Sequence, residues 1–145
     1  MNDKVKISCP NCAALNNFPL GSEGKKVICG RCKNTLPVPG EVLEPNSEQA
    51  LSLIQKSRLP VLVDFYSPTC MPCHMMNPIV VSLARRRRGE IMVIKVNTDD
   101  IPQLAGAYGI MGIPTFIVFR KGLELGRTSG ALSEGDFSLW VANLA

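Results

Sequence analysis

The sequence predicts an α/β fold preceded by a small metal-binding domain, and three observations lead to this prediction. After residue 40, apolar strand-like runs alternate with helix-like segments, as in sheets covered by helices. Residues 1–38 hold two Cys-x-x-Cys pairs but lack the periodicity needed to build a core. A third Cys-x-x-Cys pair closely follows an apolar run. We therefore expect two domains, formed by residues 1–38 and 39–145.

The composition is that of a packed, water-soluble protein. Of its 145 residues, 46% are hydrophobic, and no apolar stretch approaches the roughly 18 residues of a membrane span. No apolar segment of the kind found in secretory signals follows the N-terminal residues. We therefore expect a cytoplasmic location and no membrane partner. In such a reducing compartment, cysteines are more often metal ligands or catalytic groups than structural disulfides.

The net charge of +4 resides in residues 1–40, which hold six Lys or Arg and two Asp or Glu, while the remainder is balanced. Four thiolates around one Zn²⁺ would reduce the charge of this segment to about +2. Phe18 is its one aromatic residue, so a platform for stacking bases is missing. The sequence thus argues against nucleic acid as a partner.

The second domain opens with a linker, an edge strand and a capped helix. Residues 37–40, Pro-Val-Pro-Gly, form a stiff linker, and residues 41–44 can form a short strand. Asn46 or Ser47 can cap a helix over the apolar positions that follow. Residues 61–66 are almost continuously apolar, as expected for a strand buried on both faces.

Helix and strand signals continue to alternate beyond this strand. A helix is expected from Cys73 to about Arg88, with a kink at Pro78. The later elements are a strand over residues 91–96, a short helix over 103–108, a hairpin over 115–119 and 123–128, and a helix opened by a capping box at 133–136. This order predicts a sheet covered by helices.

Two knuckles in the first domain have the spacing of a structural zinc site. Cys9 and Cys12 form one knuckle and Cys29 and Cys32 the other, with 16 residues between them. Four thiolates suit tetrahedral Zn²⁺, and we expect Gly30 to supply a positive φ in its knuckle. Zinc binding of roughly 10–16 kcal/mol would offset the missing core. A redox switch that releases zinc and a pair of disulfides are the alternatives.

The third pair, Cys70-Met71-Pro72-Cys73, predicts a redox-active dithiol at the start of a helix. The positive end of a helix favours thiolate over thiol, which makes Cys70 nucleophilic. Cys73 lies where it can attack a mixed disulfide. The proline between them is tolerated in the first helical turn. A metal half-site or simple packing are alternatives, because one Cys-x-x-Cys pair is only moderately specific.

Asp64 lies inside the apolar run of residues 61–66, where an ionised carboxylate is costly to bury. Desolvation should raise its pKa and make it a proton acceptor for the resolving thiol. The alternative is a structural carboxylate paired with Lys95, which itself lies in a strand.

Further motifs accompany these residues along the chain: Val63-Asp64-Phe65, Lys95-Val96-Asn97, Tyr108-Gly109-Ile110, Gly112-Ile113-Pro114-Thr115, Gly122, Gly130-Ala131-Leu132 and Ala142-Asn143-Leu144-Ala145. With the three Cys-x-x-Cys pairs and Pro78, this set resembles the thioredoxin family, and within it the thioredoxin 2 type with an N-terminal zinc ribbon. The resemblance implies the thioredoxin fold, a central mixed β-sheet flanked by helices, and a protein disulfide reductase.

The resemblance also implies roles for individual residues. Cys70 would be the attacking nucleophile, Cys73 the resolving thiol and Asp64 the buried acid. Pro114 would be a cis-proline facing the dithiol, and the backbone of Ile113 would pair with an extended substrate segment. Met71 and Pro72 would contact the substrate beside the attacking sulfur.

The partners implied by the resemblance are protein disulfides and an NADPH-dependent flavoprotein, thioredoxin reductase. Structural zinc bound by the four N-terminal cysteines would be the cofactor, with no organic cofactor. The alternative function is a zinc-dependent, redox-responsive binding or holdase module, in which the dithiol is auxiliary.

The sequence departs from the family pattern around the dithiol. The family usually has Trp at positions 66 and 69, Gly at 71 and Lys or Arg at 74, where this chain has Tyr66, Thr69, Met71 and His74. The loss of Trp at 69 removes a rigid contact plane for partners. Protonated His74 could support the Cys70 thiolate, or it could be a half-exposed helix residue.

Residues 85–88 are four consecutive arginines, a pattern that can bind nucleic acid or an acidic partner. They fall at a helix C-terminus, where cations offset the helix dipole. The interpretation we favour is a solvated helix end.

Overall fold

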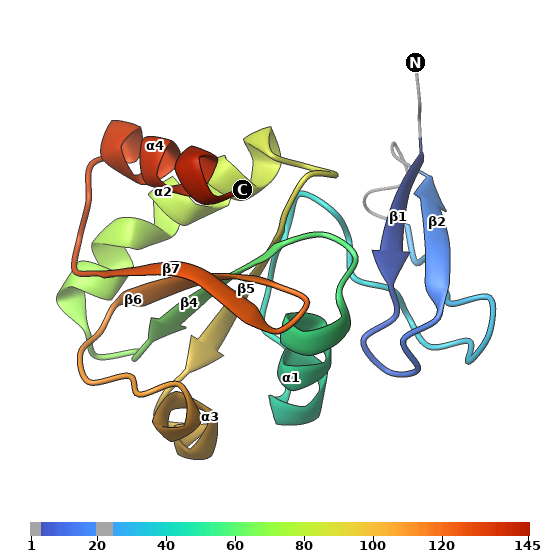
Figure 1. Ribbon diagram of the computed structural model, residues 1–145, viewed down its shortest axis with the longest axis horizontal. Helices are drawn as coiled ribbons and strands as arrows, with labels where there is room; N and C mark the ends of the chain where they lie inside the picture. The colour runs from blue at the N-terminus through green and yellow to red at the C-terminus, as the bar shows by residue number, and fades with distance from the viewer. Residues whose placement is uncertain (1–3, 20–24) are drawn as a thin grey trace.

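The computed structural model describes residues 4–19 and 25–145, which form two adjoining parts (Figure 1). The smaller part contains an antiparallel hairpin of β1 (Lys4–Ser8) and β2 (Leu15–Pro19). The larger part contains a five-stranded sheet with helices on both faces. Among the described residues, no helix is long and apolar enough to cross a lipid bilayer.

The larger part has the topology of the thioredoxin fold. Its elements, in chain order, are β3 (Val42–Leu43), α1 (Ser47–Lys56), β4 (Val61–Tyr66), α2 (Met71–Arg86), β5 (Met92–Asn97), α3 (Pro102–Ala107), β6 (Thr115–Arg120), β7 (Leu123–Ser129) and α4 (Glu134–Leu144). The sheet order is β3-β5-β4-β6-β7. β3, β5 and β4 are parallel, whereas β6 and β7 are antiparallel to their neighbours. The predicted fold is confirmed.

Two apolar clusters pack against the two faces of the sheet. In Figure 1, α2 and α4 lie on one side and α1 and α3 on the other. Leu62 of β4 packs toward α2 and α4, where the rings of Phe116 and Phe137 lie 4.9 Å apart. Phe65 of β4 packs toward α1 and α3. β4, between β5 and β6, is therefore covered on both faces, as its composition predicted.

The local signals explain where the helices begin. The side chain of Asn46 accepts a hydrogen bond from the Gln49 N–H, and the Gln49 side chain accepts one from the Asn46 N–H, so α1 has a complete capping box. Ser133 caps α4 by accepting from Asp136 N–H. The reciprocal bond of the expected box is not formed, because the Asp136 side chain is one methylene shorter than Glu or Gln.

The helix containing the third cysteine pair begins earlier than predicted. It starts at Met71 rather than Cys73, and Cys70 is its N-cap residue. The helix continues through Pro78 to Arg86, and the kink stays a prediction.

The β6–β7 hairpin follows its turn signal. Lys121 and Gly122 both have positive φ, 51° and 84°, as in the two-residue turns that match strand twist.

The hairpin of β1 and β2 was not predicted from the sequence. Its strands are five residues each, and its inward side chains are few. Ile7 and Phe18 are fully buried, and they share an apolar cluster with Leu53 and Ile54 of α1. The larger part therefore stabilises the hairpin. The sequence does not show this, because the strands are short and their alternation of apolar and polar residues is weak.

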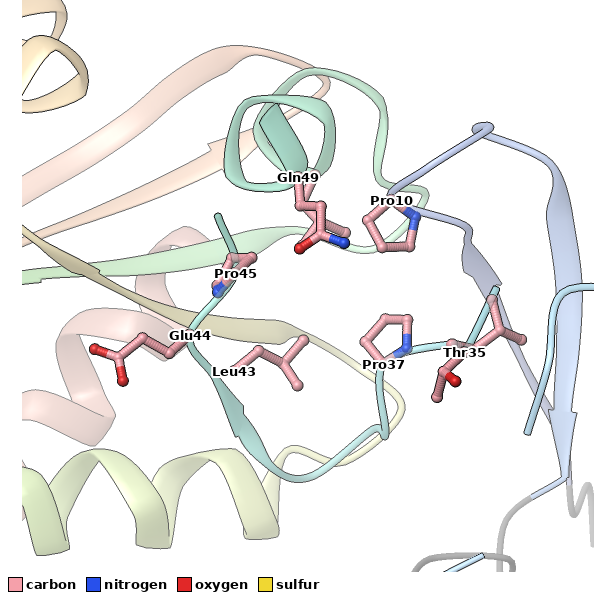
Figure 2. A pocket seen from close by; sticks show the side chains of 9 residues that line it. Pro10, Thr35, Pro37, Leu43, Glu44, Pro45 and Gln49 are labelled. Carbon is pink, nitrogen blue, oxygen red and sulfur yellow. The ribbon is translucent and has the colours of Figure 1, made fainter. Parts of the chain in front are cut away.

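The seam between the two parts contains a polar tie and a proline-lined hollow. The Ser8 hydroxyl donates to the Lys56 carbonyl at 3.3 Å and accepts from the Arg58 N–H at 3.2 Å. The hollow, of about 210 Å³, has Pro10 and Pro37 on one side and Leu43 and Pro45 on the other, with Gln49 beside Pro10 (Figure 2).

We expect Ser8→Ala to lower the free energy of unfolding by about 1–3 kcal/mol, because the buried Ser8 hydroxyl makes two hydrogen bonds, each worth about 0.5–1.5 kcal/mol. Urea denaturation monitored by circular dichroism measures this change. Ser82→Ala, which alters an exposed hydroxyl, is the control and should change stability by less than about 0.5 kcal/mol. An equal loss of unfolding free energy in both variants would contradict a stabilising role for the two hydrogen bonds of the Ser8 hydroxyl.

Candidate functional site

Cys70 and Cys73 form a disulfide at the N-terminus of α2. Their Cα atoms lie 5.2 Å apart, and Cys73 N–H donates to the Cys70 sulfur at 3.2 Å. Cys73 is 3% exposed, whereas Cys70 is partly exposed. The Cys70 sulfur is therefore the one that an incoming disulfide can reach. Both the N–H donor and the helix terminus favour negative charge on it.

A second loop faces this disulfide. The Ile113–Pro114 peptide bond is cis, and the Ile113 carbonyl oxygen lies 3.7 Å from the Cys70 sulfur. Met71 is 69% exposed and Met111 is 99% exposed. The surroundings of the accessible sulfur thus combine a backbone edge with flexible apolar side chains, a surface that can adapt to different protein segments.

Asp64 is buried in β4 on the α2 side of the sheet, since it alternates in phase with Leu62. Burial raises the pKa of its carboxyl to about 7, although the nearby Lys95 lowers it. Its Oδ1 atom has no hydrogen-bond partner. A carboxyl with this pKa and a vacant acceptor can exchange a proton near neutral pH.

The alternative for Asp64, an ion pair with Lys95, is not formed. The two residues are register partners on β4 and β5. However, the Lys95 ammonium donates to Asn77 Oδ1 at 3.0 Å and lies 4.1 Å from the centre of the Tyr66 ring. Lys95 therefore acts on the Asp64 carboxyl at longer range.

Sequence reasoning missed the network that holds the loop before Cys70. The Ser67 hydroxyl donates to Asp99 Oδ2 at 3.0 Å and lies 3.2 Å from Thr69 Oγ1. Cys70 N–H donates to the Ser67 carbonyl at 3.1 Å. Ser67 and Asp99 are 32 residues apart, so no sequence signal could join them. Thr69, where the family has Trp, thus belongs to a polar network.

His74 does not contact the Cys70 sulfur. Its Nε2 lies 2.6 Å from the Pro68 carbonyl oxygen, so the ring donates to the loop that precedes the disulfide. His74 therefore fixes this loop, and direct support of the thiolate is not seen.

The four N-terminal cysteines converge on one point. Their sulfur atoms all lie within 4.8 Å of one another, with Cys9 3.6 Å from Cys32 and Cys12 3.6 Å from Cys29. Four thiolates bound tetrahedrally at about 2.3 Å would be about 3.8 Å apart. The cluster therefore has the size and donor set of a thiolate metal site.

The two knuckles share one backbone pattern, which corrects the expectation for Gly30. The positive φ values fall at Ala13 (66°) and Lys33 (67°), each directly after the second cysteine of a knuckle, and not at Gly30. In both knuckles that residue donates its N–H to the carbonyl of the first cysteine. The residue with positive φ is therefore the one after the second cysteine. The Cys-x-x-Cys spacing does not identify that position.

N–H donors surround the sulfurs. Cys29 accepts from Arg31 N–H and from the Asn16 side chain, both at 3.4 Å. Hydrogen bonds from the Cys32 N–H and from Asn16 lower the pKa of the Cys29 thiol to about 5. Burial raises the pKa of Cys9 to about 11, so its ionisation needs a cation beside it. Outer donors of this kind orient ligands and stabilise thiolates around a metal.

Two of the four arginines at the end of α2, Arg86 and Arg87, make structural contacts. Arg86 donates to Ser138 at 2.8 Å and lies 3.8 Å from Glu134. Arg87 pairs with Glu90 and donates to the carbonyl of Ala145 at 2.8 Å. The favoured interpretation is a solvated helix end; Arg86 remains half exposed, and both arginines also join α2 to the C-terminal helix and its end.

Comparisons with known proteins agree with the fold and the dithiol. A family model described as thioredoxin matches residues 41–143. Thioredoxin C-3 of Corynebacterium nephridii is 33% identical over 135 residues, which cover 93% of this chain and 92% of that protein. Thioredoxin 1 of a Nostoc species is 45% identical over 82 residues, or 57% of this chain and 77% of that protein.

Among solved structures, a mutant thioredoxin from Halobacterium salinarum NRC-1 matches with a TM-score of 0.66 and 28% identity, over 74% of this chain and 94% of that chain. The match to thioredoxin C-3 spans more residues than the family model does, so it extends into the N-terminal part.

We expect Asp64→Asn to stabilise the protein at pH 8 by up to about 4 kcal/mol, since the pKa rises by about three units on folding. The folded pKa lies above the unfolded one, so wild-type stability falls as the pH rises from about 4 to 7. The advantage of the variant should therefore shrink as the pH falls through this window. Urea denaturation between pH 4 and 8 tests it, with the exposed Asp136→Asn as control. Equal unfolding free energies of the wild type and Asp64→Asn at pH 8 would refute the claim that an ionised, buried Asp64 destabilises the protein.

Proposed function

The chain belongs to the thioredoxin family, and we propose that it is a zinc-bearing protein disulfide reductase of the thioredoxin 2 type. It is a thiol–disulfide oxidoreductase whose redox-active pair is Cys70–Cys73. The observation that carries the proposal is the disulfide itself, with one accessible and one buried sulfur at a helix N-terminus.

In the proposed reaction, the Cys70 thiolate attacks one sulfur of a substrate disulfide. A mixed disulfide forms, and the other substrate sulfur leaves as a thiolate. The Cys73 thiol passes its proton to the Asp64 carboxylate and attacks the Cys70 sulfur. The second substrate thiolate then leaves, and both substrate sulfurs take up protons. The substrate gains two electrons, and the Cys70–Cys73 disulfide seen in the structure remains.

The proposed substrate site is formed by the Ile113 backbone and the apolar surface of Met71 and Pro72. An extended substrate segment would pair with the backbone at Ile113, beside the cis bond to Pro114. Backbone pairing is independent of side chains, which suits many protein disulfides. The oxidised pair would be reduced again by an NADPH-dependent thioredoxin reductase, as in related proteins.

We propose that Cys9, Cys12, Cys29 and Cys32 bind one structural Zn²⁺. The sulfur separations and the surrounding N–H donors support this assignment. Bound zinc would hold the two knuckles together where few apolar side chains can. We also retain the division into domains 1–38 and 39–145, which is supported by the Pro-Val-Pro-Gly linker and by a family match that begins at residue 41.

Both proposed cysteine sites require reduced thiols, so we propose that the protein works in the cytoplasm. A dithiol reductase needs a compartment that keeps its reductase supplied, and thiolate zinc ligands are lost when they oxidise.

We expect the protein to accelerate the reduction of insulin by dithiothreitol, measured as precipitation of the insulin B chain. Cys70→Ser should show no acceleration over dithiothreitol alone. Cys73→Ser should accumulate a mixed disulfide at Cys70, visible by mass spectrometry, because the resolving thiol is missing. Normal turnover by Cys70→Ser would overturn the assignment of the nucleophile.

We expect one zinc per chain in protein prepared under reducing conditions, measured by inductively coupled plasma mass spectrometry. Cys12→Ser should lose most of the metal. Loss of a residue that only hydrogen-bonds to a metal ligand already costs about 10–100-fold in metal affinity, and here a ligand itself is removed. Insulin reduction should persist in this variant, because Cys70 follows the far end of β4. Two disulfides and no zinc in the intact protein would disprove the metal assignment.

A further inference from the structure

Two adjoining hollows on the surface form a basic groove between the hairpin and the sheet. One, of about 420 Å³, is lined by Lys4, Val5, Lys6, Asn17, Arg58, Leu59 and Gly89. The other, of about 460 Å³, is lined by Arg58, Leu59, Pro60, Glu90, Arg120 and Lys121. They share Arg58 and Leu59. We call their combined lining the basic groove; it holds five cationic residues and one acidic residue.

The groove is built from segments that hydrogen bonds hold in place. The Ser8 hydroxyl bridges β1 to the backbone at Lys56 and Arg58. The turn between β6 and β7 is tied to α1, since Gly122 N–H donates to the Ile54 carbonyl at 2.9 Å. The Pro60 carbonyl accepts from Met92 N–H at 2.8 Å. A partner would therefore meet segments whose backbone is already ordered, so the entropy cost of binding would fall mainly on the exposed cationic side chains.

Four of the cations that line the groove have no carboxylate partner within the described part of the chain. Lys6, Arg58, Arg120 and Lys121 make no ion pair there. Glu90, the acidic residue, is paired with Arg87. Uncompensated cations in a hollow raise the local concentration of anionic partners and speed their association.

The groove lies at the opposite end of the sheet from the redox site. Arg58 and Pro60 precede β4, Glu90 precedes β5 and Arg120 ends β6, whereas Cys70 follows the other end of β4. In Figure 1 this is the end of the sheet that faces β1. A partner bound in the groove would leave the Cys70 sulfur free to react.

The lining favours a polypeptide over a nucleic acid. None of its residues is aromatic, so bases would find no stacking surface. The partly exposed apolar side chains of Val5 and Leu59 lie among the cations, which suits a segment carrying both carboxylates and apolar side chains. A phosphate backbone offers no apolar groups to match them.

We propose that the basic groove binds an acidic, amphipathic segment of a partner protein and so anchors this oxidoreductase while Cys70 stays accessible. The groove needs both parts of the molecule, because Lys6 comes from the hairpin and Arg58, Arg120 and Lys121 come from the larger part. This gives the hairpin a binding role in addition to any metal that it holds. The proposal is independent of the redox reaction, and its test measures binding alone.

The test uses fluorescence anisotropy of a labelled peptide that alternates Glu with Leu, titrated with the full-length protein at 50 mM NaCl. The triple variant Arg58→Gln, Arg120→Gln, Lys121→Asn should bind at least tenfold more weakly. Asn is chosen at 121 because it tolerates the positive φ there. Raising the NaCl concentration to 0.5 M should weaken wild-type binding strongly.

A matched control, Lys25→Gln, Lys26→Gln, Arg85→Gln, removes the same charge from exposed positions outside the groove and the cysteine cluster and should retain wild-type affinity. Insulin reduction and circular dichroism should be unchanged in both triple variants. Three results would overturn the proposal: no peptide binding at 50 mM NaCl, equal loss in the two variants, or tighter binding of a 20-nucleotide DNA strand or of phosphatidylserine vesicles than of the peptide.

Discussion

The burial of β4 between β5 and β6 is the constraint on which the redox site depends. Its apolar side chains are covered on both faces, which fixes the position at which the chain leaves the sheet and turns into α2. Cys70 is the N-cap of that helix, so it accepts the Cys73 N–H. The same burial surrounds Asp64 and raises its pKa to about 7. One strand therefore positions the nucleophile and adjusts the acidity of the proposed proton acceptor.

The same residue type serves two chemistries because its surroundings differ. At α2, two sulfurs lie on one helical turn, where they can bond to each other and part again. In the knuckles, each sulfur lies 3.6 Å from one in the other knuckle, a separation that suits a shared ion. The N–H donors at Cys29 stabilise a thiolate that could bind a metal, whereas the N–H donor at Cys70 stabilises a thiolate that could attack a disulfide. The spacing within a pair does not distinguish these outcomes, because all three pairs are Cys-x-x-Cys.

Features carried by local sequence could be predicted, and features made by tertiary contact could not. The strand at residues 61–66, the Asn46 cap and the turn at Lys121-Gly122 follow from side-chain pattern and turn chemistry. The β1–β2 hairpin was missed because Ile7 and Phe18 bury themselves against α1, far along the chain. The Ser67–Asp99 hydrogen bond was missed for the same reason. Gly30 was assigned a positive φ on composition, yet Ala13 and Lys33 adopt it because the knuckle geometry demands it.

The arrangement of charge gives the molecule two functionally different ends. The exposed Met71 next to Cys70, and the exposed Met111 in the loop that leads to Ile113, suit transient contact with varied apolar segments. At the other end, Arg58, Arg120 and Lys121 present exposed cations that form no ion pair with a described carboxylate. A weak, adaptable contact is appropriate where substrates must leave after each turnover, since tight binding there would slow release. A charged contact placed at the opposite end can hold a partner through many turnovers without blocking the sulfur. Because β1 supplies Lys6 to that contact and Ser8 fixes β1 against Arg58, the added hairpin extends what the sheet could bind alone.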